Sequence, residues 1–211
     1  MIGIIDYGMG NLYSVSKALE RLRYEYVVSD QPNVLKQTKG LILPGVGSFK
    51  DAMHILRKTK LDKFIREAVN EGTPLFGICL GMQLLFEESE ENGLTEGLGL
   101  LSGRVVRIPG VTAGGERYKV PHMGWNRLVF RHPSPLLQNV EEGHVYFVHS
   151  YYVVTDDDSV VLASSFYDVE VPAVVGKGNV YGTQFHPEKS GEVGMNILQN
   201  YAAIVEGKGR V

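Results

Sequence analysis

The chain has 211 residues, 44% of them hydrophobic, which is enough to bury a large core, and we expect one domain spanning residues 1–211. Its net charge of -3 comes from mixed charges without a basic block, which argues against nucleic acid and anionic membranes as partners. The single cysteine excludes an internal disulfide, and no apolar run approaches the roughly 18 residues of a membrane helix, so we expect a cytoplasmic protein.

The first half of the chain alternates short apolar runs with helical patterns. Strands are predicted at 2–6, 24–29, 40–45 and 73–79. Helices are predicted from Asn11 onward, briefly after Pro32, and over 51–71. Strands that alternate with helices in this way favour right-handed crossovers and a parallel sheet, with active-site residues at the carboxyl ends of its strands.

After residue 100 the pattern becomes β-rich. Strand-like segments lie at 103–108, 145–154, 160–166 and 172–185, and the last one turns at 176–179 as a hairpin would. A helix over 193–205 is predicted at the end, whereas the loop at 110–119 indicates no particular function. We therefore predict an α/β fold: a mostly parallel central sheet with helices on both faces, and an extra β-rich region in the second half.

The only cysteine, Cys79, lies between Gly77 and Gly81 in the segment GICLG. A lone cysteine in an apolar strand is more often a small buried hydrophobic residue. Glycines on both sides, however, are typical of a nucleophile elbow, in which a tight turn from strand to helix lifts the central side chain clear of the sheet. The amide of Leu80 would then point into the same space, and a helix over 80–91 would favour thiolate over thiol.

A candidate base and its orienting acid occur in the segment GTQFHPEKS. His186 and Glu188 are two residues apart, so in an extended segment their side chains point the same way. A surface His and Glu at the end of a strand is the alternative interpretation. Together with Cys79 they form a Cys, His, Glu constellation of the kind that thiol catalysis requires. The remaining histidines show no metal-ligand spacing, and we expect neither a metal nor a cofactor.

Several separated motifs resemble class I glutamine amidotransferases. They are PGVGSF at 44–49, GICLGMQLLFEES at 77–89, PHMGWN at 121–126 and FHPEKS at 185–190. Within that family, IDYGMGNLYSV at 5–15 and VPHMGWN at 120–126 are similar to the glutaminase subunits of imidazole glycerol phosphate synthases. The resemblance extends from residue 2 to about residue 200.

The resemblance implies a role for each motif. Cys79 attacks the side-chain amide of glutamine, His186 passes a proton to the leaving ammonia, and Glu188 orients His186. Backbone amides stabilise the oxyanion, and these belong to Leu80 and to Val46 and Gly47, where glycine permits a peptide rotation. The positions implied for glutamine binding are Gly47, Gln83, Ser150 and Tyr151.

The resemblance also implies a partner, a (β/α)₈ cyclase that forms a heterodimer with this subunit and receives its ammonia through a protected channel. The cyclase makes imidazole glycerol phosphate and aminoimidazole carboxamide ribotide in histidine biosynthesis. Residues expected at the interface are Met9, Asn11, Met123, Trp125, Tyr146 and Lys189, although ordinary packing explains any one of them nearly as well.

Three other interpretations remain open at this stage. One is the glutaminase of another class I amidotransferase, against which PHMGWN and PGVGSF argue. Another is a cysteine hydrolase that acts alone, and the third is a flavodoxin-like binding module with a structural cysteine. Measuring glutaminase activity with and without a cyclase distinguishes the first two interpretations from the expected function. Loss of glutamate release on substitution of Cys79 would argue against the third.

Overall fold

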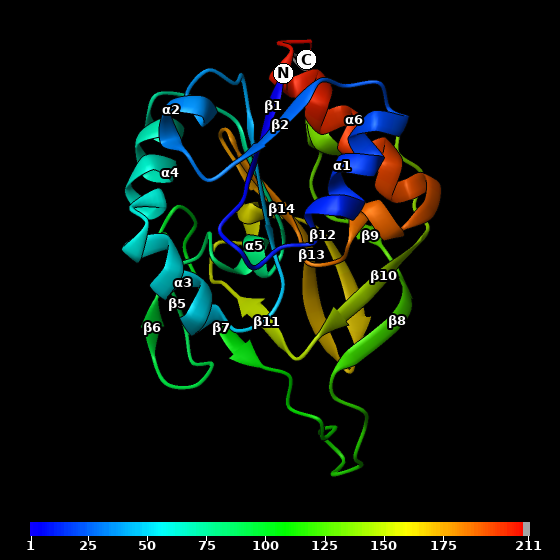
Figure 1. Cartoon of the computed structure of the whole chain (residues 1–211). Coiled ribbons are helices and arrows are strands. Elements are labelled where there is room, and N and C mark those ends of the chain that lie inside the picture. The colour runs from blue at the N-terminus through cyan, green and yellow to red at the C-terminus, as the bar shows by residue number, and fades with distance from the viewer. Residues whose placement is uncertain (209–211) are drawn as a thin grey trace.

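The computed structural model describes residues 1–208, and its central feature is an eight-stranded sheet (Figure 1). The strand order is β2-β1-β3-β4-β14-β13-β12-β9, and four of its seven neighbouring pairs are parallel. The parallel part consists of β1 (Ile2–Ile5), β2 (Tyr26–Ser29), β3 (Leu41–Gly45), β4 (Leu75–Cys79) and β14 (Val180–Thr183). The antiparallel part consists of β13 (Val169–Lys177), β12 (Val161–Tyr167) and β9 (Val129–Phe130). The predicted mostly parallel α/β fold is confirmed.

Helices cover both faces of this sheet (Figure 1). One face carries α1 (Leu12–Arg21) and α6 (Gly191–Val205), whose apolar side chains share one core cluster. The other face carries α2 (Pro32–Leu35), α3 (Phe49–Lys58) and α4 (Leu61–Asn70), which share a second cluster. Strands β3 and β4 are buried along their whole length, as expected for strands covered on both sides.

The single helix predicted over 51–71 is wrong, because the structure divides this segment into α3 and α4. The break is at Lys60, which has a φ of 62° and so leaves the right-handed helical region. Each of the two short helices then turns its own apolar face toward the same core, with Leu56 buried on α3 and Phe64 buried on α4.

The helix predicted over 80–91 is also wrong beyond its first turn, since α5 covers only Leu80–Gln83. The following residues Leu84, Leu85 and Phe86 are all fully buried, so the apolar side chains point in every direction rather than to one helical face. The chain then enters β5 (Glu88–Ser89), which pairs with β6 (Thr95–Glu96) and β7 (Arg104–Arg107).

The predicted strands at 160–166 and 172–185 extend the central sheet as β12, β13 and β14. Apart from β9, the remaining strands of the second half form two smaller sheets, one of them together with β5 and β6. The predicted strand at 145–154 divides at Ser150 into β10 (His144–His149) and β11 (Tyr151–Val154). Strand β11 joins β7, β5 and β6, whereas β10 pairs with β8 (His122–Arg127), a strand that the sequence pattern did not indicate. Three short 3₁₀ turns complete the elements: η1 (Pro135–Leu137), η2 (Asp158–Val160) and η3 (Pro187–Lys189).

The carboxyl ends of three parallel strands meet at one edge of the sheet. Gly45 at the end of β3 lies in register with Cys79 at the end of β4, and Ile78 lies in register with Thr183 at the end of β14. The segments that follow these strands are therefore brought together, as is general for open parallel sheets.

Candidate active site

Cys79 is the last residue of β4 and sits on a strained turn. It has a φ of 55° and a ψ of -111°, which a residue with a side chain rarely adopts. A methyl group added at Gly81 would lie 1.8 Å from the carbonyl oxygen of Leu43, and one at Gly77 would lie 2.6 Å from that of Gly81. Gly81 is thus required for the turn to pack against β3, and Gly77 for the turn to fold back onto its own strand. The elbow geometry predicted from GICLG is present.

His186 and Glu188 are paired and buried. Nδ1 of His186 lies 2.9 Å from Oε1 of Glu188, and the two side chains are 4% and 0% exposed. Because the carboxylate accepts, Nδ1 carries the hydrogen, which fixes the orientation of the ring. The predicted pairing within FHPEKS is therefore found in the structure.

The neighbours of the His186 imidazole raise its pKa. Burial is the largest influence on its pKa and acts to lower it, but hydrogen bonding and charge interactions with Cys79 and Glu188 together outweigh burial. The result is a pKa raised to about 10. At neutral pH this histidine therefore holds a proton next to the sulfur of Cys79.

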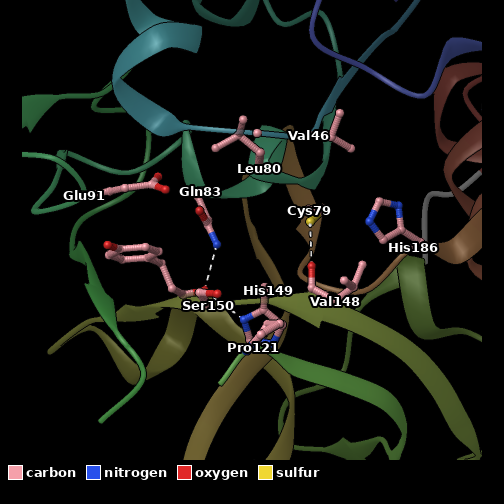
Figure 2. A pocket seen from close by; sticks show the side chains of 12 residues that line it. Val46, Cys79, Leu80, Gln83, Glu91, Pro121, Val148, His149, Ser150 and His186 are labelled. Carbon is pink, nitrogen blue, oxygen red and sulfur yellow. Dashed lines mark hydrogen bonds between the residues drawn. The ribbon is translucent and has the colours of Figure 1, made fainter. Parts of the chain in front are cut away.

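The site opens into a pocket of about 420 Å³ (Figure 2). Every residue predicted to bind glutamine or to supply an oxyanion donor lines it, together with Cys79 and His186, whereas Glu188 lies outside the lining. The residues of the predicted set in the lining are Val46, Gly47, Cys79, Leu80, Gln83, Ser150, Tyr151 and His186. Structure and sequence therefore agree on which segments converge here.

The backbone amide of Val46 is engaged elsewhere in this conformation. Its N–H donates to the carbonyl oxygen of Met9 at 2.9 Å, so it is not presented to the pocket. The next residue, Gly47, has a φ of 98°, which favours glycine. A donor from Val46 therefore requires the peptide between Gly45 and Val46 to rotate.

The pocket contains further residues for which no role was predicted. Glu91 lines the end away from Cys79 (Figure 2), accepts a hydrogen bond of 2.8 Å from the amide of Phe49, and has its pKa raised by burial. The sequence analysis placed Glu91 within a helix, which gave no indication that it faces the pocket. Pro121 and Val148 complete the lining on the side of the β8–β10 pair.

His149 also lines the pocket, although the sequence analysis noted it only as a histidine without metal-ligand spacing. Nδ1 lies 2.8 Å from the carbonyl oxygen of Tyr151, and Nε2 lies 2.9 Å from Nδ1 of His122. Burial lowers the pKa of His149 to about 3, so this ring is neutral where enzymes usually work. It holds the turn between β10 and β11 in place.

The residues predicted to contact a partner lie close to this site. Met123 and Trp125 project from β8 and are 61% and 55% exposed. Tyr146 on β10 lies opposite Trp125, with ring centroids 5.9 Å apart. The backbone carbonyl of Tyr146 accepts a hydrogen bond from the backbone N–H of His186. The others are Met9, which packs near Gly47, Asn11, which caps α1, and the exposed Lys189 next to Glu188.

Comparison with known proteins gives a consistent result. Residues 3–204 match the family described as glutamine amidotransferase class-I. The imidazole glycerol phosphate synthase subunit HisH of Geobacillus sp. (strain WCH70) is 90% identical over 209 residues, which cover 99% of this chain and 99% of that protein. The subunit of the same name from Bacillus subtilis (strain 168) is 62% identical and covers 97% of this chain and 96% of its own length.

Solved structures show the same fold at lower identity. A glutamine amidotransferase superposes with a TM-score of 0.74 at 24% identity, with 98% of each chain covered. PurLQS from Thermotoga maritima superposes with a TM-score of 0.73 at 23% identity, covering 97% of this chain and 98% of that one.

Proposed function

The chain belongs to the class-I glutamine amidotransferase family, and from this premise we propose that it is the glutaminase subunit of an imidazole glycerol phosphate synthase. The family resemblance predicted from the separated motifs is confirmed by the match over residues 3–204. The observation that carries the narrower assignment is 90% identity over nearly the whole length to a subunit of that synthase. Relatives at 75% and 62% identity have the same name, which argues against the glutaminase of another pathway.

The first half of the reaction uses the paired Cys79 and His186. The sulfur attacks the side-chain carbonyl carbon of glutamine, so a carbon–sulfur bond forms and the carbonyl electrons move to oxygen. When the oxyanion collapses, the carbon–nitrogen bond breaks, and His186 gives its proton to the leaving ammonia. A histidine whose pKa is raised to about 10 has that proton available at neutral pH.

The second half releases glutamate. Once His186 has lost its proton it acts as a base and takes a proton from water, which attacks the thioester carbon. The carbon–sulfur bond then breaks, and Cys79 leaves as a thiolate. Glu188 holds the ring in the orientation that both steps need, through the 2.9 Å bond from Nδ1. Its own burial keeps water from competing for that bond.

The pocket also suggests how glutamine is held. The side-chain amide of the substrate points toward Cys79, so its charged amino-acid end lies toward the carboxylate of Glu91 (Figure 2). A half-buried carboxylate there pairs with the substrate ammonium group. Gly47, Gln83, Ser150 and Tyr151 supply the remaining contacts, as the family resemblance implies.

Oxyanion stabilisation is incomplete in the conformation described here. The amide of Leu80 follows the elbow directly, whereas the amide of Val46 is bonded to Met9. One missing donor typically costs about 3 kcal/mol of barrier height, or roughly a hundredfold in rate. We therefore expect the isolated subunit to release glutamate slowly, and we expect rotation of the Gly45–Val46 peptide to accompany activation.

The proposed partner is a (β/α)₈ cyclase that takes up the ammonia. Ammonia becomes ammonium in water at neutral pH and then has no lone pair for attack, so the partner must cover the site. The exposed Met123 and Trp125 beside the pocket are suited to that contact, because Met and aromatic residues are enriched at interface cores. Within residues 1–208, no helix combines the length and apolar character needed to cross a membrane, and we place the complex in the cytoplasm.

Glutamate release, measured with and without the cyclase, tests the proposal. We expect slow turnover alone and a large increase when the cyclase and its nucleotide ligand are added. Cys79→Ala and His186→Ala should each abolish turnover while the far-ultraviolet circular dichroism spectrum is unchanged. Full turnover by the isolated chain would rule out the gating, and turnover by either variant would rule out the mechanism.

A further inference from the structure

A buried amide lies beside the sulfur of Cys79 and has no role in the mechanism above. Gln184 is fully buried, and its Nε2 lies 3.8 Å from Sγ of Cys79. It precedes His186 by two residues, so in this extended segment both side chains are directed to the same side. The sulfur therefore has a neutral N–H donor next to it as well as an imidazole.

The orientation of this amide follows from its hydrogen bonds. Nε2 of Gln83 lies 2.9 Å from the carbonyl oxygen of Tyr151 and 2.9 Å from Oε1 of Gln184. A carbonyl oxygen only accepts, so Gln83 must turn its nitrogen toward Tyr151. The same nitrogen then requires the oxygen of Gln184, which leaves the NH₂ group of Gln184 pointing at Cys79. Exchanging oxygen and nitrogen in Gln83 would place two acceptors face to face, and exchanging them in Gln184 would place two donors face to face.

A second neutral neighbour of the sulfur has the opposite effect. The carbonyl oxygen of Val148 lies 3.9 Å from Sγ and can only accept, so it binds the thiol and repels the thiolate. The amide of Gln184 can only donate on its nitrogen side, and such bonds strengthen when the acceptor carries a charge. When the thiol loses its proton, the interaction of the sulfur with Val148 therefore becomes unfavourable and its hydrogen bond from Gln184 becomes stronger.

We propose that Gln184 is a catalytic residue that stabilises the thiolate of Cys79 by donating its side-chain N–H to the sulfur. Gln83 is the positioning residue that turns this amide toward Cys79. Gln184 neither gives nor takes a proton: the thiolate electron pair forms the bond to the substrate carbon, and the proton that ammonia receives still comes from His186. The inference rests on the proposed function only in naming Cys79 as the nucleophile.

Alkylation of the purified chain by iodoacetamide, followed against pH, tests the inference directly. Cys79 is the only cysteine, so the reaction reports this thiol alone. Because the thiolate is the reacting form, Gln184→Met should slow alkylation about tenfold at pH values below the midpoint of the wild-type profile, while the rate at high pH is unchanged. The midpoint of the profile should move to higher pH, which a merely structural role for Gln184 would not cause.

A second variant keeps the test decisive if the first distorts the fold. Gln184→Glu retains an oxygen for Gln83 but replaces the donor that faces Cys79 with an acceptor, so it should slow alkylation below the midpoint of the wild-type profile at least as much. Thr183→Val is the matched control. It removes a buried hydroxyl on the adjacent residue, whose bond goes to the carbonyl oxygen of Phe185, and it should leave the profile unchanged.

The outcomes separate this inference from the proposed function, because alkylation needs no glutamine. A wild-type profile in both Gln184 variants would overturn the role of Gln184, even if the chain proves to be a glutaminase. A shifted profile in a chain that releases no glutamate with the cyclase would overturn the proposed function and leave the role of Gln184 standing. With the cyclase present, Gln184→Met should lower kcat while KM for glutamine stays close to the wild-type value.

Discussion

Removing the sulfur of Cys79 should lower the pKa of His186. The pKa of His186 is about 10, against an ordinary value of 6.5, which corresponds to about 5 kcal/mol of interaction in favour of the imidazolium. Burial acts in the other direction, so pairing with Cys79 and Glu188 must contribute more than this difference. Cys79→Ala removes one of the two partners and leaves burial and Glu188 unchanged.

We therefore expect the pKa of His186 to fall by at least one pH unit in Cys79→Ala, equivalent to about 1.4 kcal/mol. NMR titration of the chain with labelled histidine rings measures it. The signal of His186 can be identified among the six by one further variant, His186→Asn, in which that signal is missing. A midpoint in Cys79→Ala equal to that of the wild type would show that the sulfur does not hold the proton on His186.

Three further predictions concern packing, substrate binding and acid stability. Gly81→Ala should lower the free energy of urea unfolding by about 3 kcal/mol or more, because its methyl group would lie 1.8 Å from a carbonyl oxygen. Gly72→Ala, which has open space around it but a φ of 94°, should cost only about 1 to 2 kcal/mol of backbone strain, and equal losses would contradict the packing argument. Glu91→Gln should raise KM for glutamine roughly tenfold with little change in kcat. Glu90 is an exposed carboxylate outside the pocket lining, so the control variant Glu90→Gln should match the wild type. An unchanged KM for Glu91→Gln would refute the contact between Glu91 and the substrate ammonium group. The pKa of His149 is lowered to about 3 in the fold, so its contribution to stability is complete above pH 6.5 and is lost as the pH falls toward 3, up to about 5 kcal/mol. The free energy of unfolding of His149→Gln should therefore fall less than that of the wild type as the pH is lowered from 6.5. An identical pH dependence in the two proteins would count against a buried neutral ring.

The parts of the site that follow from short-range chemistry could be predicted from the sequence. Glycines on both sides of Cys79 indicate a tight elbow, and the structure shows that larger residues would collide with backbone there. The spacing of His186 and Glu188 in an extended segment predicts their pairing, because side chains two residues apart share a side. That these two segments meet was not predicted, because the sequence pattern assigned 172–185 to the β-rich region. In the structure β14 pairs parallel with β4, so both strands end at a common edge.

The parts that depend on contacts between distant segments could not be predicted. Helix propensity in the segment after Cys79 is overridden because Leu84 to Phe86 are buried on all sides, and this places Glu91 at the pocket instead of on a helix surface. The bond from the Val46 amide to Met9 joins two loops far apart in the chain. Gln184 gives no local signal either, since its orientation is set by Gln83 and Tyr151.

The central claim is that the sulfur of Cys79 forms a covalent bond with the substrate. Rapid acid quenching of the complex during turnover of glutamine, followed by peptide mass spectrometry, tests it most directly. We expect the peptide containing Cys79 to gain the mass of one glutamyl group, and we expect Glu188→Gln, with a less firmly oriented His186, to change the amount that accumulates. Glutamate release at full rate without any mass added to that peptide at any quench time would contradict it.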